Sequence, residues 1–251
     1  MNNLNRNGKI LAVTLDHGLT IGPIPGLINM NETVNAIQKG GASAMVAHKG
    51  IFKILDPPVD IGKIVHLSAS TSLSVFPDDK VIVGSAELSQ ETGADAISIH
   101  VNIGSKHDRN MIEDLGLIAD ECTELNMPLL AMMYPRGENI PNPFDPKVVA
   151  HVARIGAELG ADIVKTYYCE DFNELIGACP VPVVIAGGKK VPELEALKFA
   201  HNAVSDGAAG VDMGRNIFQS NSPENMIQAV RSVVVNGVGP KEAYEKYKSS
   251  L

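Results

Sequence analysis

One lysine stands inside a strongly apolar stretch of this chain. Lys165 occurs in the run Asp-Ile-Val-Lys-Thr-Tyr-Tyr. A buried ammonium is costly unless it is neutralised or paired. Desolvation and any nearby cation lower the pKa of a lysine and release an amine that attacks carbonyl groups. We therefore expect Lys165 to be a nucleophile with a lowered pKa; the alternative is a structural lysine bridged to a carboxylate.

Two residues elsewhere in the chain could move protons for such an amine. Asp16 precedes His17 and Gly18, and a carboxylate near an amine can shuttle protons through carbinolamine and imine steps. Tyr134 precedes Pro135, and its phenol could act on a substrate hydroxyl. The alternatives are an N-cap or loop aspartate and a packed aromatic ring with a solvated tip.

Two glycine-bearing turns are typical of a phosphate site. Gly187-Gly188 and Gly214-Arg215 each follow a short apolar run. Glycine lets backbone N–H groups approach a phosphate, and a short helix N-terminus and an arginine complement its charge. These turns predict a phosphorylated substrate, and they explain how a protein with a net charge of −8 could hold an anion.

Four histidines leave a metal-dependent mechanism open. His17, His48, His66 and His100 fall in or just after the first four apolar runs, where imidazoles could hold zinc and polarise a carbonyl. No pair has the spacing of a dedicated metal motif, and single histidines in strands are more often hydrogen-bonded core residues. We expect no metal or other cofactor, with a metal-assisted aldolase or isomerase as the competing reading.

The elements that must position these residues form a repeating pattern. Eight short apolar runs alternate with stretches of helical periodicity, which predicts parallel strands covered on both faces. We expect one α/β domain over residues 1–251, a (β/α)8 TIM barrel, rather than a doubly wound open sheet. The expected strands are Ile10–Leu15, Ala44–Ala47, Ile64–Ser68, Ala96–Val101, Leu129–Tyr134, Ile163–Tyr167, Val183–Ala186 and Gly210–Met213.

The intervening helices and their ends are also readable. Helical spacing marks Glu32–Lys39, Met111–Asn126, Pro146–Leu159 and Pro192–Ser205. A Gly-Ala pair at residues 41, 93, 160 and 207 precedes every second strand, as expected for a helix C-cap that needs a positive φ. The remaining apolar run, Val81–Ala86, is interpreted as the approach to the helix before the fourth strand.

Composition limits the class of protein further. The chain has 251 residues, 21 basic against 29 acidic side chains, and three cysteines without CxxC spacing. The acidic balance argues against nucleic-acid and anionic-membrane partners. The cysteine usage fits a reducing cytoplasm, and neither a signal peptide nor a membrane span is expected.

Several motifs resemble a known family. They are Leu-Asp-His-Gly (15–18), His-Lys-Gly-Ile (48–51), His-Leu-Ser-Ala-Ser-Thr (66–71), Met-Met-Tyr-Pro-Arg-Gly (132–137), Val-Lys-Thr-Tyr-Tyr (164–168) and Val-Ile-Ala-Gly-Gly (184–188). The chain resembles the archaeal-type class I fructose-bisphosphate aldolases and the related 2-amino-3,7-dideoxy-D-threo-hept-6-ulosonate synthases, almost from end to end. The Met-Met before Tyr134 and the two histidine motifs look more like the synthase branch.

The resemblance implies roles for particular residues. It implies a Schiff-base lysine at Lys165, a proton-shuttling aspartate at Asp16 and an acid–base tyrosine at Tyr134. It implies phosphate binding by the turn residues Gly187, Gly188, Gly214 and Arg215, and His17 is a further candidate for substrate or phosphate binding.

The resemblance also implies substrates and an assembly. A ketose-phosphate donor such as dihydroxyacetone phosphate would be joined to L-aspartate semialdehyde, for aromatic amino acid or aminohydroxybenzoate-type biosynthesis. The alternative is fructose-bisphosphate cleavage and synthesis in glycolysis and gluconeogenesis. A cytoplasmic homo-oligomer, commonly a decamer, is implied, with 243–251 as a candidate contact. A non-catalytic phosphosugar-binding barrel is a further competing reading.

Overall fold

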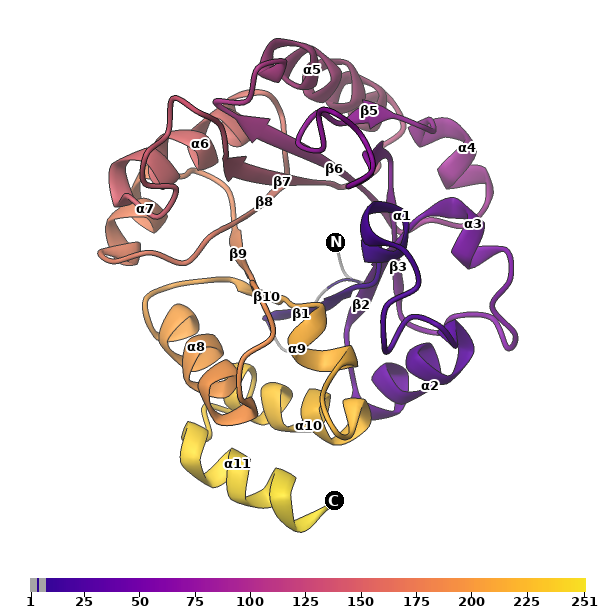
Figure 1. The fold of residues 1–251 in the computed structure, drawn as a ribbon, viewed down its shortest axis with the longest axis vertical. Helices are drawn as coiled ribbons and strands as arrows, with labels where there is room; N and C mark the ends of the chain where they lie inside the picture. Colours follow the sequence, from indigo (N-terminus) through magenta and orange to yellow (C-terminus); the bar gives the residue numbers. More distant parts are fainter. Residues whose placement is uncertain (1–3, 5–7) are drawn as a thin grey trace.

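The computed structural model describes Leu4 and residues 8–251, and these form a closed barrel (Figure 1). The eight barrel strands are parallel and follow the order β1-β10-β9-β8-β7-β6-β3-β2 around the ring. This confirms the predicted TIM barrel. The strands are β1 (Ile10–Thr14), β2 (Ala44–Ala47), β3 (Gly62–His66), β6 (Ala96–Ile103), β7 (Leu129–Pro135), β8 (Ile163–Thr166), β9 (Val183–Ala186) and β10 (Gly210–Asp212).

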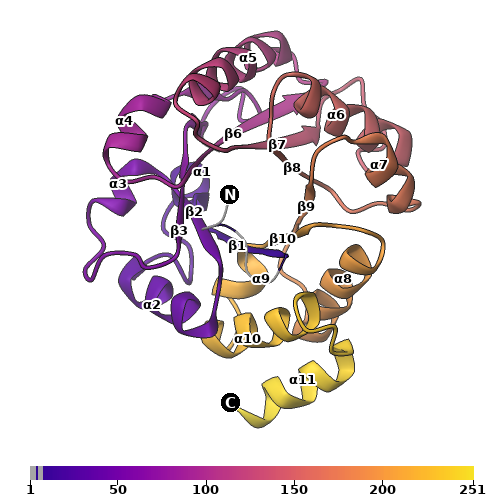
Figure 2. The same ribbon diagram turned by 180° about the vertical axis from the view of Figure 1, so that it is seen from behind.

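Helices surround the barrel on its outside (Figures 1 and 2). The outer helices are α2 (Met30–Gly40), α3 (Lys49–Phe52), α4 (Ala86–Glu91), α5 (Asp108–Glu124), α6 (Pro146–Glu158), α7 (Phe172–Ala178), α8 (Glu193–Ser205) and α10 (Pro223–Val234). Two short helices, α1 (His17–Ile21) and α9 (Arg215–Phe218), follow directly on β1 and β10. The last helix, α11 (Pro240–Ser249), packs against α8 and α10. None of the helices in the described residues is long and apolar enough to cross a membrane.

The barrel has two apolar cores. Side chains such as Ala12, Val46 and Ile64 fill its interior, and Leu4 packs with them. A larger core lies between the strands and the outer helices, with Ile37 and Leu115 among its fully buried members. Because strand residues alternate between these two cores, both faces of each strand are apolar, as the sequence pattern predicts.

The Gly-Ala pairs do end helices. Gly41, Gly93, Gly160 and Gly207 have φ values of +89°, +85°, +100° and +108°. A side chain at these positions would be strained, so glycine permits the next strand to start at once. The recurrence of Gly-Ala before every second predicted strand is therefore explained by the positive φ that ends each helix.

One predicted segment contains a strand that was not predicted. The run Val81–Ala86 leads into α4, which begins at Ala86, as predicted, but its first two residues form β5 (Val81–Ile82), which pairs antiparallel with β4 (Ser68–Ala69). β-Branched residues that lie at the surface pair well with a neighbouring strand. The two short strands bring residue Lys80 back to the mouth of the barrel.

Candidate active site

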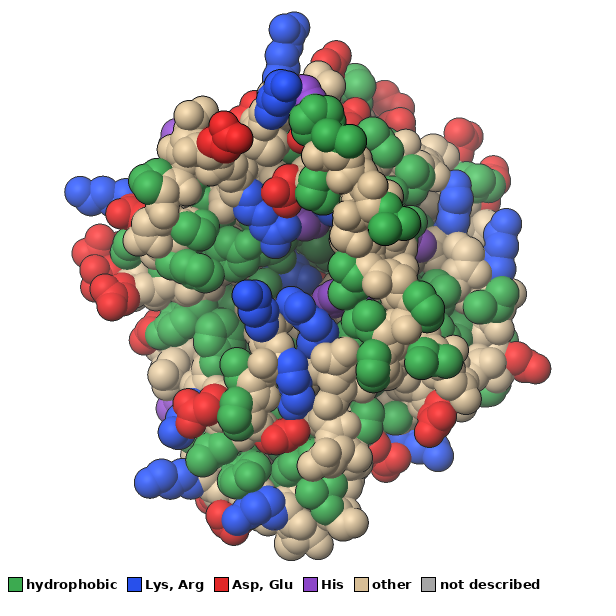
Figure 3. Space-filling view, in the orientation of Figure 1, with side chains coloured by type: hydrophobic (Ala, Val, Ile, Leu, Met, Phe, Trp, Pro, Cys, Tyr) green, Lys and Arg blue, Asp and Glu red, His purple; other side chains and the backbone are tan. Residues whose placement is uncertain are grey.

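A cavity of about 250 Å³ opens at the carboxyl ends of the barrel strands. Figure 3 shows the hollow from this side, with Lys and Arg side chains around it. All strands of the barrel are parallel, so their carboxyl ends meet here and bring distant residues together. All eight candidate residues, Asp16, His17, Tyr134, Lys165, Gly187, Gly188, Gly214 and Arg215, have positions at this end, and all line the cavity.

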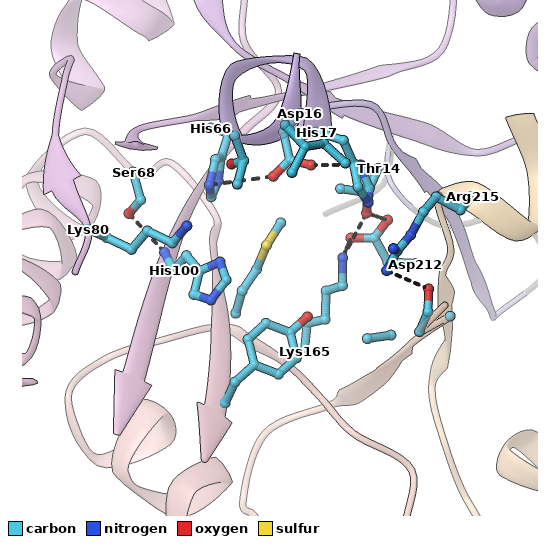
Figure 4. A pocket seen from close by; sticks show the side chains of 18 of the residues that line it. Thr14, Asp16, His17, His66, Ser68, Lys80, His100, Lys165, Asp212 and Arg215 are labelled. Carbon is cyan, nitrogen blue, oxygen red and sulfur yellow. Dashed lines mark hydrogen bonds and ion pairs between the residues drawn. The ribbon is translucent and has the colours of Figure 1, made fainter. Parts of the chain in front are cut away.

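Lys165 lies at the centre of a hydrogen-bonded group of three side chains (Figure 4). It is 4% exposed, and its Nζ donates to Thr14 Oγ1 at 2.7 Å and to Asp212 Oδ2 at 2.8 Å. The Thr14 hydroxyl in turn donates to Asp212 Oδ1. The lysine is therefore both buried and paired with a carboxylate.

This pairing corrects one expectation about Lys165. Burial by itself lowers the pKa of the ammonium, but the Asp212 carboxylate favours the charged form and raises the pKa above its usual value. The predicted lowering was wrong because Asp212 comes from another strand, 47 residues further along the chain. The alternative expectation, a lysine bridged to a carboxylate, matches the contact between Lys165 and Asp212 in this structure.

Asp16 makes its contacts with two histidines. Its carboxylate oxygens lie 3.3 Å from His17 Nδ1 and 3.6 Å from His66 Nε2. It occupies the N-cap position of α1, but its side chain makes no capping hydrogen bond. Burial opposes ionisation, yet the His17 contact and the charges of His66 and Lys165 hold the pKa of Asp16 well below its usual range. Asp16 is thus a carboxylate that faces the cavity, while the hydrogen bonds of Lys165 go to Thr14 and Asp212.

Tyr134 stands at the end of β7 among other rings. It is 5% exposed, and its ring lies 4.9 Å from that of His100 and 4.7 Å from that of Tyr167, centroid to centroid. The Arg136 guanidinium lies over the same ring at 5.0 Å. Burial raises the pKa of Tyr134 to about 12, although Lys165 opposes the shift. The phenol therefore carries its proton at neutral pH.

The other histidines of the cavity form hydrogen bonds within the barrel. His66 Nδ1 lies 2.8 Å from Ser98 Oγ, His48 Nδ1 lies 3.1 Å from the His66 carbonyl oxygen, and His100 Nε2 lies 2.8 Å from Asn102 Oδ1. Burial lowers the pKa of all three, that of His66 to about 3. Within Leu4 and 8–251, no three His, Cys, Asp or Glu side chains are grouped to hold a metal ion.

The two glycine-bearing turns lie beside each other. Arg215 Nη2 donates to the Gly188 carbonyl at 3.0 Å, and Asn216 Nδ2 donates to the Gly187 carbonyl at 2.6 Å. Gly188 has a φ of +68°, which side chains rarely adopt. A Cβ at Gly214 would lie 2.6 Å from His17 Cε1, so only glycine fits next to that ring. The Arg215 Nε is buried without a hydrogen-bond partner among the described residues.

A second group of cations lies on the other side of the cavity. Lys80 is 9% exposed, and its Nζ donates to Ser70 Oγ at 2.6 Å. Arg136 Nε donates to the Tyr167 hydroxyl at 2.9 Å. Burial and the Arg136 charge lower the pKa of Lys80. In Figure 4 Lys165 lies between Lys80 and Arg215, so cations lie on both sides of the buried amine.

Sequence reasoning missed Thr14, Lys80 and Asp212 in this cavity. Asp212 had a usable signal, because it is an acid in the apolar run Gly-Val-Asp-Met, just as Lys165 is a base in one. Two opposite charges in two apolar strands are best explained as partners. Lys80 lacked such a signal, since it lies in a polar loop.

Comparison with known proteins agrees with this geometry. Residues 10–220 match the family described as DeoC/LacD family aldolase. The chain is 42% identical over 247 residues to 2-amino-3,7-dideoxy-D-threo-hept-6-ulosonate synthase 1 of Archaeoglobus fulgidus, covering 98% of this chain and 93% of that protein. It is 41% identical over 234 residues to 2-amino-4,5-dihydroxy-6-oxo-7-(phosphonooxy)heptanoate synthase of Streptomyces griseus, covering 91% and 85%.

A solved structure extends the likeness to three dimensions. The chain superimposes with a TM-score of 0.87 and 29% identity on a Schiff-base-forming fructose-1,6-bisphosphate aldolase, covering 93% of this chain and 97% of that one. The family match spans most of the chain and includes β1 to β10, which supply the cavity. The chain therefore belongs to the DeoC/LacD family of aldolases and is a class I, lysine-dependent aldolase.

Proposed function

We propose that this aldolase joins a phosphorylated ketose-type donor to L-aspartate semialdehyde, as in the synthase branch of its relatives. The observation that carries the proposal is the buried amine of Lys165 in a cavity with cations on both sides. A donor phosphate and an acceptor carboxylate are two anions, and each needs its own cationic partner. The names of the synthases from Archaeoglobus fulgidus and Streptomyces griseus support this branch.

In the proposed mechanism the donor ketone forms an imine with Lys165. The imine withdraws electrons from the adjacent carbon and so permits a carbon–carbon bond to form or break there. Tyr134 carries a proton at neutral pH and acts on the donor hydroxyl. Asp16 is ionised and moves protons on the acceptor side, together with the histidines that it contacts.

The donor phosphate binds between the two glycine-bearing turns. The backbone of Gly187, Gly188 and Gly214 leaves room for a close approach, and Arg215, which lines the same cavity, supplies the positive charge. Binding energy from this remote group orients the ketone against Lys165. The acceptor carboxylate lies on the opposite side, against Lys80 and Arg136.

Reductive trapping tests the proposal. The protein is incubated with dihydroxyacetone phosphate or fructose 1,6-bisphosphate, treated with sodium borohydride, and measured by intact and peptide mass. We expect a reduced adduct on the peptide that holds Lys165, and none in a Lys165→Ala variant whose circular dichroism is unchanged. In separate reactions without borohydride, turnover of the donor that gives the adduct is then measured with aspartate semialdehyde and with glyceraldehyde 3-phosphate, which compares the two branches.

Three results would contradict the proposal in different ways. Faster turnover of glyceraldehyde 3-phosphate would favour the fructose-bisphosphate alternative. Activity that survives borohydride but disappears with a chelator would favour the histidine–metal reading. Tight binding of sugar phosphates, with no carbon–carbon bond made or broken across a panel of acceptors, would favour a non-catalytic phosphosugar-binding barrel.

We also propose a cytoplasmic homo-oligomer. The three cysteines are free and buried, which fits a reducing compartment. Leu73 and Val75 are 92% and 85% exposed in the loop between β4 and β5, and they offer apolar surface to a neighbouring subunit. Light scattering on a sizing column should give a multiple of 26.6 kDa. A mass near one chain would contradict an oligomer.

A further inference from the structure

Burial of the Asp212 carboxylate costs free energy, and the stability of the fold does not explain why this residue is there. Its side chain is fully buried, and it is the last residue of β10, paired with Ala12 of β1 and with Ala186 of β9. Buried ion pairs are seldom more stabilising than apolar side chains of similar size. A carboxylate held 2.8 Å from the amine that performs the chemistry therefore has a reason other than stability.

We propose that Asp212 is a catalytic residue that takes a proton from the Lys165 ammonium when the donor binds and returns it to the oxygen that leaves as water. The inference rests on the proposed imine chemistry at Lys165. Asp212 Oδ2 already accepts a hydrogen bond from Nζ, so the proton moves along an existing contact. Asp16, which sequence reasoning assigned to this step, has its contacts with His17 and His66 instead.

The atoms and charges of this cycle balance. Lys165 starts as an ammonium beside the Asp212 carboxylate and passes it one proton. The lone pair of the free amine attacks the ketone carbon, the C=O π pair moves to oxygen, and a proton shift from nitrogen to oxygen gives a neutral carbinolamine. The Asp212 carboxylic acid then protonates that hydroxyl, water leaves, and the iminium forms. Asp212 is again a carboxylate beside a cation.

Thr14 holds the carboxylate for this task. Its hydroxyl accepts from Lys165 Nζ and donates to Asp212 Oδ1, which leaves Oδ2 directed at the amine. Thr14 is a positioning residue, because it ends β1 and acts through Asp212. The arrangement joins β1, β8 and β10, so strand pairing keeps the three groups in register.

Other ionisable groups come near Lys165 from other strands of the barrel and can also influence the pH dependence of its reaction. They are Tyr134 at the end of β7, Asp16 after β1 and His66 at the end of β3. Tyr134 holds its proton and His66 stays neutral at neutral pH. Asp212 is the carboxylate that is hydrogen-bonded to the amine.

The test separates imine formation from turnover. The rate of adduct formation with dihydroxyacetone phosphate is measured by cyanoborohydride quenching and intact mass, from pH 5.5 to 9, for the wild type, Asp212→Asn and Asp212→Ala. We expect Asp212→Asn to form the imine roughly 100-fold more slowly at pH 7, with donor affinity within about twofold. Formate, a small carboxylate, should accelerate Asp212→Ala in a concentration-dependent manner.

A matched control keeps the result specific. Asp206→Asn removes a carboxylate that accepts a hydrogen bond from Tyr168 near the surface, and it should leave the trapping rate unchanged. An Asp212→Asn rate equal to or above that of the wild type, most of all below pH 7, would show that Asp212 only holds the resting ammonium. An Asp212→Ala variant that does not respond to formate would equally overturn the inference. No adduct on the wild type would overturn the imine proposal itself.

Discussion

At the scale of single residues, the protein depends on a buried ion pair that is expensive to break. Lys165 and Asp212 are both withdrawn from water and satisfy each other. Removal of one partner leaves the other charge buried and unpaired, and this typically costs about 3–5 kcal/mol. The proposed nucleophile is therefore also a determinant of stability.

The free energy of unfolding should therefore fall when one partner is removed and recover when both are replaced. The free energy of unfolding of Lys165→Met should be lower than that of the wild type by about 3–5 kcal/mol, with a lower urea midpoint. The double variant Lys165→Met/Asp212→Asn should recover most of that loss. Urea titration followed by circular dichroism measures all three proteins. A double variant no more stable than the single one would mean that the ion pair contributes little. Both variants should lose roughly 10⁴-fold or more in turnover, because neither has the amine.

Tyr134 allows a second prediction at this scale. Tyr134→Phe keeps the ring and its packing on His100 and Tyr167 but removes the hydroxyl. We expect kcat to fall roughly 100-fold or more while donor binding stays within a few-fold, because the lost group acts on protons. The wild-type kcat should show no ionisation of Tyr134 below pH 10, since the pKa of this phenol is about 12. Steady-state kinetics between pH 6 and 10 would detect an unchanged kcat, which would remove Tyr134 from the mechanism.

At the scale of elements, the junction of β10 with α9 is constrained by its neighbours. Gly214 lies so near β1 and α1 that a Cβ would stand 2.6 Å from His17 Cε1 and 2.8 Å from the Thr14 carbonyl oxygen. The carbonyl belongs to a paired strand and cannot easily move. The φ of Gly214, −104°, is open to other residues, so the backbone conformation does not require glycine. Glycine is needed here because two segments approach each other closely.

Gly214→Ala is therefore expected to damage both stability and binding. Overpacking at such a contact costs about 1–3 kcal/mol, and the shifted turn should raise the donor KM about tenfold, equivalent to about 1.4 kcal/mol. Gly177→Ala is the matched control, because a Cβ there meets nothing within 4 Å in α7. That control should be neutral or stabilised by up to ~1 kcal/mol. Equal effects of the two substitutions would contradict the close-approach argument.

At the scale of the whole molecule, the buried histidines couple stability to pH. His48, His66 and His100 all have pKa values below 6.5 in the folded protein, that of His66 at about 3, with burial as the main cause. Below pH 6.5 the unfolded chain takes up protons on these rings, while the folded chain still excludes the proton from His66. The unfolded state then binds more protons, so the free energy of unfolding falls as the pH falls.

The contribution of one ring, His66, to this loss of stability can be measured separately. Between pH 6.5 and 4 each excluded proton contributes a slope of about 1.4 kcal/mol per pH unit. Urea unfolding at pH 7, 6, 5 and 4.5 should show a steeper loss for the wild type than for His66→Gln, by about that slope. The lowered pKa of Asp16 affects stability mainly below its usual value of 3.8, so it contributes little to this window. Parallel curves for the two proteins would contradict a neutral buried His66.

Much of the barrel could be predicted from the sequence, because local patterns carry it. Apolar runs such as Val183–Ala186 coincide with observed strands, and the positive φ of Gly41 follows from its place after a helix. The pairing of β5 with β4 was not predictable in this way, because strand pairing at the surface depends on a partner that is elsewhere in the chain. Lys80 reaches the cavity for the same reason.

The sequence by itself determined which residues come to the mouth of the barrel, because alternating strands and helices send every strand end to one side. It singled out Lys165, because a cation in an apolar strand is costly unless it has a partner or a function. Only the tertiary structure decided the state of that cation. Asp212 reaches it from β10, two strands away in the barrel, Thr14 connects the two, and Asp16 contacts the histidines. The protonation of a buried amine depends on the charges within a few ångströms, and closure of the barrel, rather than the order of residues along the chain, sets those distances.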